Sequence, residues 1–216
     1  MENIRSKIIQ EKLIVIIRGV PADKLVPLCN ALFKGGIRLV ELPFDATGYI
    51  SDEEISSMIS LLCEEFSEKL VVGAGTVLSI NQVKLAKKSG AKFIVSPDTN
   101  LDVIEATKKL GLISIPGALT PTEIRAASVV GADFVKIFPI SSMPSDYLKL
   151  ITLPLGRVKM LAVGNVNKDN IKEYLNAGAV GACIGSYLVP KDLIALDDYD
   201  AIAERAGDLV KYIIEE

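Results

Sequence analysis

Residues 121–139, PTEIRAASVVGADFVKIFP, contain one complete structural repeat and decide the fold. Thr120 is a good helix N-cap and proline is favoured in the first helical turn, so a helix is expected to begin at Pro121. Gly131 ends the helical run, because glycine tolerates the left-handed conformation that closes a helix. Aromatic and β-branched residues at 134–138 then predict a buried strand. A helix followed by a buried strand is the repeating unit of an α/β fold.

This unit recurs along the chain, where short apolar runs alternate with amphipathic helical stretches, several of which end in glycine. Eight such units predict an all-parallel sheet, and eight parallel strands close into a (β/α)8 TIM barrel. The expected strands are residues 13–17, 38–42, 70–72, 93–96, 113–116, 134–138, 159–163 and 182–184. The expected helices include residues 22–34, 80–89, 101–110, 121–130 and 168–177.

The main alternative is an open doubly wound sheet, which normally has fewer strands. No linker rich in proline, glycine or serine and no break in composition divides the chain, so we expect one domain over residues 1–216. Two further helices, at residues 2–10 and 199–214, are expected to cap the barrel or to pack against it.

The composition favours a cytoplasmic globular protein. Half of the 216 residues are hydrophobic, which suffices for a sizeable core, and the net charge of −3 does not suggest a nucleic-acid partner. Cys29, Cys63 and Cys183 have no metal-like spacing and are typical of free thiols in a reducing compartment. We expect no membrane span and no signal peptide. The chain has no histidine, which excludes Ser-His-Asp and Cys-His catalysis and histidine-ligated metals.

Lys136 is the most informative residue for function, because it interrupts the buried run at 134–138. Burying an ammonium without a partner is expensive, and a buried amine lowers that cost by releasing its proton. The neutral amine is a nucleophile that can form a Schiff base with a carbonyl. The alternative is a structural lysine that reaches water or pairs with a carboxylate.

In a TIM barrel the active site lies at the C-terminal ends of the strands. The residues expected there provide an amine, a carboxylate, a guanidinium and several backbone turns, which together suit a keto-acid substrate. They are Arg18, Glu41, residues 73–76, Ser96-Pro97, Pro116-Gly117, Lys136, Gly164-Asn165 and Gly185-Ser186.

Three of these features also have structural interpretations. Glu41 lies in an apolar strand, where burial raises the pKa of a carboxyl group, but it could equally form an ion pair with Arg18 or Lys136. The GAGT run at 73–76 lacks the third glycine of a dinucleotide site, and we expect a turn at which the backbone approaches a small ligand. Gly185-Ser186 could bind an anion, or it could simply cap a helix.

Six segments are specific when they are taken in order along the chain: residues 35–41 (GGIRLVE), 72–78 (VGAGTVL), 93–97 (FIVSP), 115–117 (IPG), 135–139 (VKIFP) and 184–189 (IGSYLV). Together they resemble the 2-keto-3-deoxy-6-phosphogluconate (KDPG) / 4-hydroxy-2-oxoglutarate (KHG) aldolase family, class I pyruvate aldolases on a (β/α)8 barrel. The similarity runs essentially from end to end.

The resemblance implies a role for each site residue. Lys136 matches the Schiff-base lysine, and Glu41 matches the general acid/base. The substrate-binding positions are Arg18 and Thr76 near the pyruvate carboxylate, Pro97 and Phe138 as walls, and Gly164, Asn165, Gly185 and Ser186 at the phosphate end. Family members are commonly homotrimers, and the chemistry needs no metal or organic cofactor.

The implied lyase reaction cleaves a 2-keto-4-hydroxy acid of the KDPG or KHG type to pyruvate plus glyceraldehyde 3-phosphate or glyoxylate, within carbohydrate metabolism. Lys136 attacks the C2 ketone, and the protonated imine stabilises the charge left when the C3–C4 bond breaks. Glu41 moves the protons, directly or through a water. The expected partner is therefore a small 2-keto acid, with neither nucleic acid nor membrane involved.

The chain departs from the family pattern at three positions. The family often has threonine two residues and arginine four residues after the catalytic glutamate, where this chain has Pro43 and Asp45. Asp45 reverses a charge that would help to bind an anionic substrate. After the seventh strand the family usually has a pair of glycines, where this chain has Gly164-Asn165. The Asn165 side chain can crowd a phosphate or make another hydrogen bond.

These departures leave the aldehyde half of the substrate open. Two other classes of function also stay open on the sequence. One is a phosphate-binding barrel isomerase or epimerase, in which Lys136 is an electrostatic contact. The other is a catalytically silent barrel that binds a metabolite.

Overall fold

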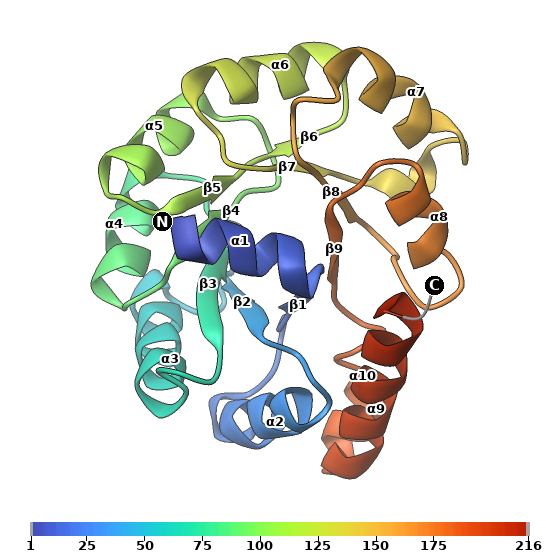
Figure 1. Ribbon diagram of the computed structural model, residues 1–216. Helices are drawn as coiled ribbons and strands as arrows, with labels where there is room; N and C mark the ends of the chain where they lie inside the picture. The colour runs from blue at the N-terminus through green and yellow to red at the C-terminus, as the bar shows by residue number, and fades with distance from the viewer. Residues whose placement is uncertain (1, 215–216) are drawn as a thin grey trace.

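The computed structural model describes residues 2–214. Nine short parallel strands curve into a nearly closed barrel, which the helices surround (Figure 1). The strand order is β5-β4-β3-β2-β1-β9-β8-β7-β6, so the two ends of the sheet are consecutive in the chain. The strands are β1 (Leu13–Ile16), β2 (Leu39–Pro43), β3 (Val71–Gly75), β4 (Phe93–Val95), β5 (Ile113–Ile115), β6 (Gly117–Ala118), β7 (Val135–Ile137), β8 (Met160–Val163) and β9 (Gly181–Ile184).

The strand count differs from the prediction at Pro116. The sequence predicted one strand over residues 113–116, but β5 pairs with β4, β6 pairs with β7, and Pro116 belongs to neither strand. Proline has no N–H group to donate to a neighbouring strand, although its carbonyl oxygen accepts a hydrogen bond from the Lys136 N–H at 2.8 Å. The all-parallel, nearly closed sheet also excludes the open doubly wound alternative.

Several helix boundaries fall where the sequence predicted them. Thr120 caps α6 through a reciprocal pair of hydrogen bonds with Glu123, and Gly131 closes that helix at a φ of 101°. The helices are α1 (Glu2–Glu11), α2 (Ala22–Lys34), α3 (Asp52–Glu65), α4 (Ile80–Lys88), α5 (Leu101–Lys109), α6 (Pro121–Val130), α7 (Tyr147–Leu155), α8 (Ile171–Asn176), α9 (Lys191–Ala195) and α10 (Tyr199–Ile214), with a 3-10 turn η1 (Ile140–Ser142). Within residues 2–214, none of these helices combines the length and the apolar character that a membrane span requires.

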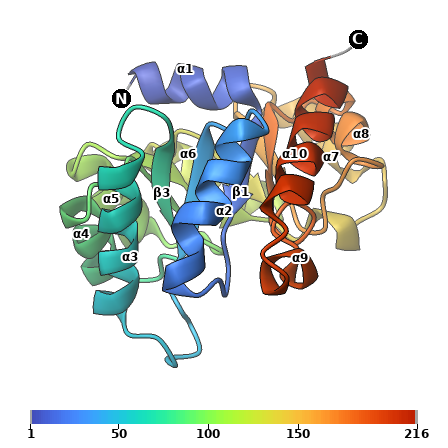
Figure 2. The ribbon, with the colours of Figure 1, turned by 90° about the horizontal axis from the view of Figure 1, so that it is seen from below.

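The barrel has a closed end and an open end. Side chains such as Leu39, Phe93, Phe134 and Leu161 fill its interior, and Ile8 of α1 packs against them with 1% of its surface exposed. Figure 2 shows α1 across one end of the barrel, with α9 and the loop before α3 at the opposite end. α10 packs beside α2 in the outer ring. The C-terminal ends of the strands are therefore left to the loops that follow them.

A buried carboxylate links several structural elements at the closed end of the barrel. Asp133, just before β7, pairs with Arg5 of α1 and with Lys108 of α5, whose Nζ lies 2.5 Å from Oδ2. The same oxygen accepts a hydrogen bond from the Ser114 N–H at 2.8 Å. Asp133 thus ties α1, α5 and β5 together where the strands begin.

Candidate active site

A cavity of about 750 Å³ opens at the C-terminal end of the barrel. Nine of the ten site residues predicted from the sequence line it, and they come from the ends of β1, β3, β4, β7, β8 and β9. Those nine are Arg18, Thr76, Pro97, Lys136, Phe138, Gly164, Asn165, Gly185 and Ser186. The tenth, Glu41, lies in β2 and is buried, with 2% of its surface exposed.

Lys136 occupies the middle of β7 and is 7% exposed. Its neighbours Val135 and Ile137 belong to the core outside the barrel, so the alternation along the strand turns Lys136 inward. Its Nζ lies 4.6 Å from the centroid of the Phe138 ring. Among the residues that the structure describes, no carboxylate comes within 4.0 Å of the ammonium, so the structural ion pair considered for this lysine is absent.

Glu41 faces the interior from β2, where burial raises the pKa of its carboxyl group from 4.5 to about 7. The positive charges of Lys136 and Arg18 oppose that rise without cancelling it. Within residues 2–214 the Glu41 Oε2 atom has no hydrogen-bond partner, and the carboxylate forms no ion pair. A carboxyl group with a pKa near neutrality can both donate and accept a proton, which is the requirement for general acid–base catalysis.

Glycines in β3 make the room that Glu41 needs. A Cβ atom added at Gly75 would overlap the Glu41 carboxylate, and one added at Gly73 would overlap the ring of Phe93. The prediction that residues 73–76 form a turn for a ligand is therefore wrong, because the first three of them belong to β3. Their lack of side chains accommodates neighbouring side chains of the barrel.

Thr76 follows β3 with a φ of 50°, in the left-handed region that β-branched residues rarely adopt. Its Oγ1 accepts a hydrogen bond from the Arg18 Nη2 at 2.9 Å. Strained backbone of this kind concentrates at ligand sites, where the surrounding structure holds it. The pair presents a guanidinium and a hydroxyl group together at the cavity wall.

Asp45 does not line the cavity, although the sequence suggested that its charge would act on an anionic substrate. Its carboxylate accepts hydrogen bonds from the N–H and hydroxyl groups of Thr47 and from the Ile50 N–H. These bonds, the Thr47 hydroxyl first, lower the pKa of Asp45 to about 2. The side chain therefore organises the loop before α3.

Two further cavity residues with titratable side chains were missed from the sequence. Lys191 is an exposed lysine at the start of α9, a helix that the sequence pattern did not predict. Cys183 of β9 lies on the cavity floor, and burial raises the pKa of its thiol to about 12, which keeps the thiol protonated and unreactive. The sequence offered one signal that these residues line the cavity: Cys183 lies within the last predicted strand and Lys191 follows it.

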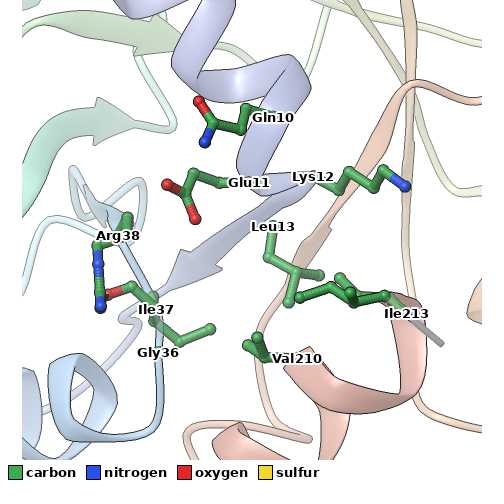
Figure 3. A pocket seen from close by; sticks show the side chains of 10 residues that line it. Gln10, Glu11, Lys12, Leu13, Gly36, Ile37, Arg38, Val210 and Ile213 are labelled. Atoms are coloured by element: carbon green, nitrogen blue, oxygen red, sulfur yellow. Dashed lines mark hydrogen bonds between the residues drawn. The ribbon is translucent and has the colours of Figure 1, made fainter.

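A second, smaller cavity of about 150 Å³ lies at the closed end, between the end of α1 and the last turn of α10 (Figure 3). Apolar side chains such as Leu13, Ile37 and Val210 line much of it. Its Arg38 is already engaged, because Nη1 donates to the carbonyl oxygens of Phe33 and Ile37 at 3.0 and 2.8 Å and the guanidinium covers the Phe33 ring. These contacts hold the Arg38 guanidinium in place, and the candidate active site is the larger cavity at the open end.

The aldolase family described as "KDPG and KHG aldolase" matches residues 4–205. The chain belongs to this family. The 2-dehydro-3-deoxy-phosphogluconate aldolase of Haemophilus influenzae is 31% identical over 215 residues, covering 99% of this chain and 96% of the relative. The 2-dehydro-3-deoxy-6-phosphogalactonate aldolase of Escherichia coli is 32% identical over 200 residues, covering 92% and 93%.

A solved structure is similar as well. The KDPG aldolase of Legionella pneumophila, with pyruvate captured at low pH as a covalent carbinolamine intermediate, matches with a TM-score of 0.83 at 26% identity, covering 95% of this chain and 97% of that one. The family expected from the sequence is confirmed. The protein is an aldolase, and therefore a lyase, of the class I pyruvate type.

Proposed function

We propose that Lys136 is the Schiff-base nucleophile of this aldolase and that Glu41 is its general acid/base. The observation that carries the proposal is a buried amine that faces the cavity without an ion-pair partner among the described residues, in the electrostatic field of a carboxyl group whose pKa is about 7. The substrate is a 2-keto-4-hydroxy acid of the KDPG or KHG type. The products are pyruvate and an aldehyde, either glyceraldehyde 3-phosphate or glyoxylate.

The reaction begins when the neutral amine of Lys136 adds to the C2 ketone and forms a carbinolamine. Protonated Glu41 gives its proton to the departing hydroxyl group, so that water leaves and a protonated imine forms. The Glu41 carboxylate then accepts the C4 hydroxyl proton, directly or through a water. The C3–C4 electron pair moves into the imine as the aldehyde leaves, and an enamine remains.

The cycle closes with the same two residues. Glu41, now protonated, returns its proton to C3 of the enamine and regenerates an imine, this time of pyruvate. Addition of water to that imine releases pyruvate and restores the amine of Lys136. A single carboxyl group can serve every proton transfer because its pKa lies near neutrality.

The other cavity residues hold the substrate. The Arg18–Thr76 pair supplies donors for the pyruvate carboxylate, in which a guanidinium is well suited to a planar oxyanion. Pro97 and Phe138 form the walls on either side of the imine. We assign the remaining part of the cavity to the aldehyde half of the substrate. It is lined by Gly164, Asn165, Gly185 and Ser186.

We also propose that β5 and β6 act as one barrel strand interrupted at Pro116, which makes the fold a (β/α)8 barrel in a single domain of residues 1–216. Support comes from the one-residue separation of the two strands and from their pairing with opposite neighbours. The Pro116 carbonyl continues the hydrogen bonding from β6 toward β7.

The proposed assembly is a homotrimer in the cytoplasm. Ile80 and Leu101, the first residues of the adjacent helices α4 and α5, are 43% and 42% exposed, and such apolar side chains suit contact with another copy. Light scattering after size-exclusion chromatography measures the mass directly. Three free thiols, two of them buried, suit a reducing compartment.

Trapping with borohydride tests the catalytic proposal. The protein is incubated with pyruvate and sodium borohydride, and the modified peptide is mapped by mass spectrometry. We expect a reduced pyruvyl adduct on Lys136 in the wild type and in K159M, and none in K136M. Lys159 is a matched control, because it also lies near an aromatic ring, that of Phe134, at 5.9 Å, but it precedes β8 at the closed end.

The outcomes separate the functions that the sequence left open. An adduct on Lys136 establishes the nucleophile. A folded wild type that gives no adduct, beside a positive control, argues for an isomerase or a binding protein in which Lys136 acts only by its charge. An adduct that persists in K136M would move the nucleophile to another lysine.

A further inference from the structure

Ser96, directly after β4, is a buried polar residue to which the proposed reaction gives no role. It precedes the cavity wall residue Pro97 but does not line the cavity itself, and 3% of its surface is exposed. Its hydroxyl group donates a hydrogen bond of 2.7 Å to the backbone carbonyl oxygen of Val77, 19 residues earlier in the chain. This bond links the segment after β3 to the end of β4.

Val77 is held through both of its backbone polar groups. Its N–H donates to the carbonyl oxygen of Val95 in β4 at 3.2 Å, and its carbonyl oxygen accepts the bond from Ser96. Ser96 is itself fixed, because its N–H donates to the carbonyl oxygen of Ile115 in β5 at 3.1 Å. The Ser96 hydroxyl is the one side-chain group among these contacts, so a substitution can remove it and leave the backbone contacts in place.

Thr76 lies between Val77 and the end of β3, and it is fixed on both sides. Before it, Gly75 pairs with Pro43 of β2, and the Gly75 carbonyl oxygen accepts a hydrogen bond from the Phe44 N–H at 2.8 Å. Thr76 spans these two anchors with a φ of 50°. A β-branched residue adopts this left-handed conformation only where its surroundings impose it.

The backbone conformation of Thr76 decides where its hydroxyl group lies. In the structure the Thr76 Oγ1 accepts a hydrogen bond from the Arg18 Nη2 at 2.9 Å, and both side chains line the cavity. A return of Thr76 to the favoured β region would turn its side chain in another direction and break this pair. The contacts from Ser96 through Val77 to Thr76 thus connect a buried hydroxyl group to the donors at the cavity wall.

We propose that Ser96 is a positioning residue for the reaction: its bond to Val77 holds Thr76 in the conformation that presents the threonine hydroxyl to the substrate. This inference rests on the proposed function, in which the Arg18–Thr76 pair receives the pyruvate carboxylate. Ser96 lies outside the cavity lining, so it acts through Thr76 and not on the reacting atoms. Its loss should weaken the binding of the carboxylate and leave the chemistry of Lys136 intact.

Borohydride trapping at different pyruvate concentrations tests the proposal. The half-saturating pyruvate concentration and the maximal rate of labelling at Lys136 are measured for the wild type and S96A. We expect S96A to raise the half-saturating concentration by about fivefold to tenfold and to leave the maximal rate within about twofold. S89A is the matched control, because Ser89 is also a buried residue whose hydroxyl donates to a backbone carbonyl, that of Leu85 at 3.0 Å, but it lies away from the cavity.

A double-mutant cycle tests whether Ser96 acts through Thr76. In a T76A background the hydroxyl group that Ser96 positions is absent, so S96A should change the half-saturating concentration by less than about twofold. S96C keeps the shape of the side chain but is a weak donor, and it should raise that concentration in the same direction.

Two outcomes would overturn the proposal. One is an unchanged half-saturating concentration in S96A, or in S96C if S96A does not fold. The other is an effect of S96A in the T76A background as large as in the wild type. Absence of a pyruvate adduct in the wild type tells instead against the proposed catalytic chemistry.

Discussion

The two ends of this barrel differ in whether their buried ionisable side chains form ion pairs. At the closed end, the buried carboxylate of Asp133 is matched by Arg5, by Lys108 and by a backbone N–H group. At the open end, Lys136 and Glu41 are also buried, with 7% and 2% of their surfaces exposed, yet within the described residues neither forms an ion pair. The comparison teaches that pairing stabilises a fold, whereas reactivity requires buried groups that are left without partners.

The unpaired groups carry a cost in stability. Burial of a charge without a partner is unfavourable, and the raised pKa of Glu41 is the measurable sign of that cost. Exchanging charged side chains for neutral ones of similar shape should therefore have opposite effects at the two ends. The substitutions below test this contrast, from the largest expected effect to the smallest.

Lys136→Met should abolish cleavage of 2-keto-4-hydroxy acids, with a loss in kcat of more than about a thousandfold, because no other group replaces a covalent nucleophile. The same variant should be at least as stable as the wild type, since a buried amino group without an ion-pair partner is replaced by an apolar chain of similar length. A coupled assay for pyruvate and a urea titration measure the two effects. Lys159→Met at the closed end should leave kcat unchanged. A comparable loss of activity in this variant would contradict the assignment of catalysis to the open end.

Glu41→Gln keeps the shape of the side chain but removes the group that carries protons. We expect kcat to fall by about a hundredfold to ten-thousandfold, the usual contribution of a general acid/base. Some pyruvate imine should still form and be trapped by borohydride, because the amine of Lys136 is intact. Single-turnover kinetics separate the two steps. Wild-type kcat in this variant would transfer the proton-carrying role to another group.

The same carboxyl group should shape the dependence of stability on pH. Its pKa rises from 4.5 in the unfolded chain to about 7 in the folded protein, so its contribution to stability is complete below pH 4.5. That contribution is lost as the pH rises through about 7, and the total loss is about 3 kcal/mol. Urea unfolding at pH 5 and pH 8 measures it. Glu41→Gln should flatten this dependence and should be the more stable protein at pH 8, which an unchanged slope would contradict.

Local patterns predicted much of the fold. The bounds of α2, α6 and α10 follow from caps, glycine stops and helical periodicity, and Thr120 with Glu123 shows how local that information is. The division of a strand at Pro116 could not be read in the same way. It depends on which neighbouring strand each side of the proline contacts, and that is decided by the curvature of the whole sheet.

The site shows the same limit. Lys136 and Glu41 stand out in sequence because each interrupts an apolar strand, whereas Lys191 lies among ordinary surface residues and gains its position only from the return of the chain after β9. Gly75 suggested a ligand-binding turn, but its neighbour is the Glu41 carboxylate from another strand. The surroundings of these residues depend on contacts between segments that are distant in the sequence, and a local sequence pattern does not predict such contacts.

Asp133→Asn is the closed-end counterpart of Glu41→Gln, and it should affect stability alone. The Asp133 side chain is 1% exposed, but its partners Arg5 and Lys108 are 45% and 24% exposed, so water can solvate the cations once the carboxylate is neutral. We therefore expect a loss of about 2 kcal/mol, below the range for a fully buried pair. Urea unfolding measures that loss, and assays well below the unfolding midpoint should give an unchanged kcat. The opposite sign of the two carboxyl-to-amide changes at pH 8, one stabilising and one destabilising, is the sharpest form of the contrast, because it compares the same chemical change at paired and unpaired sites.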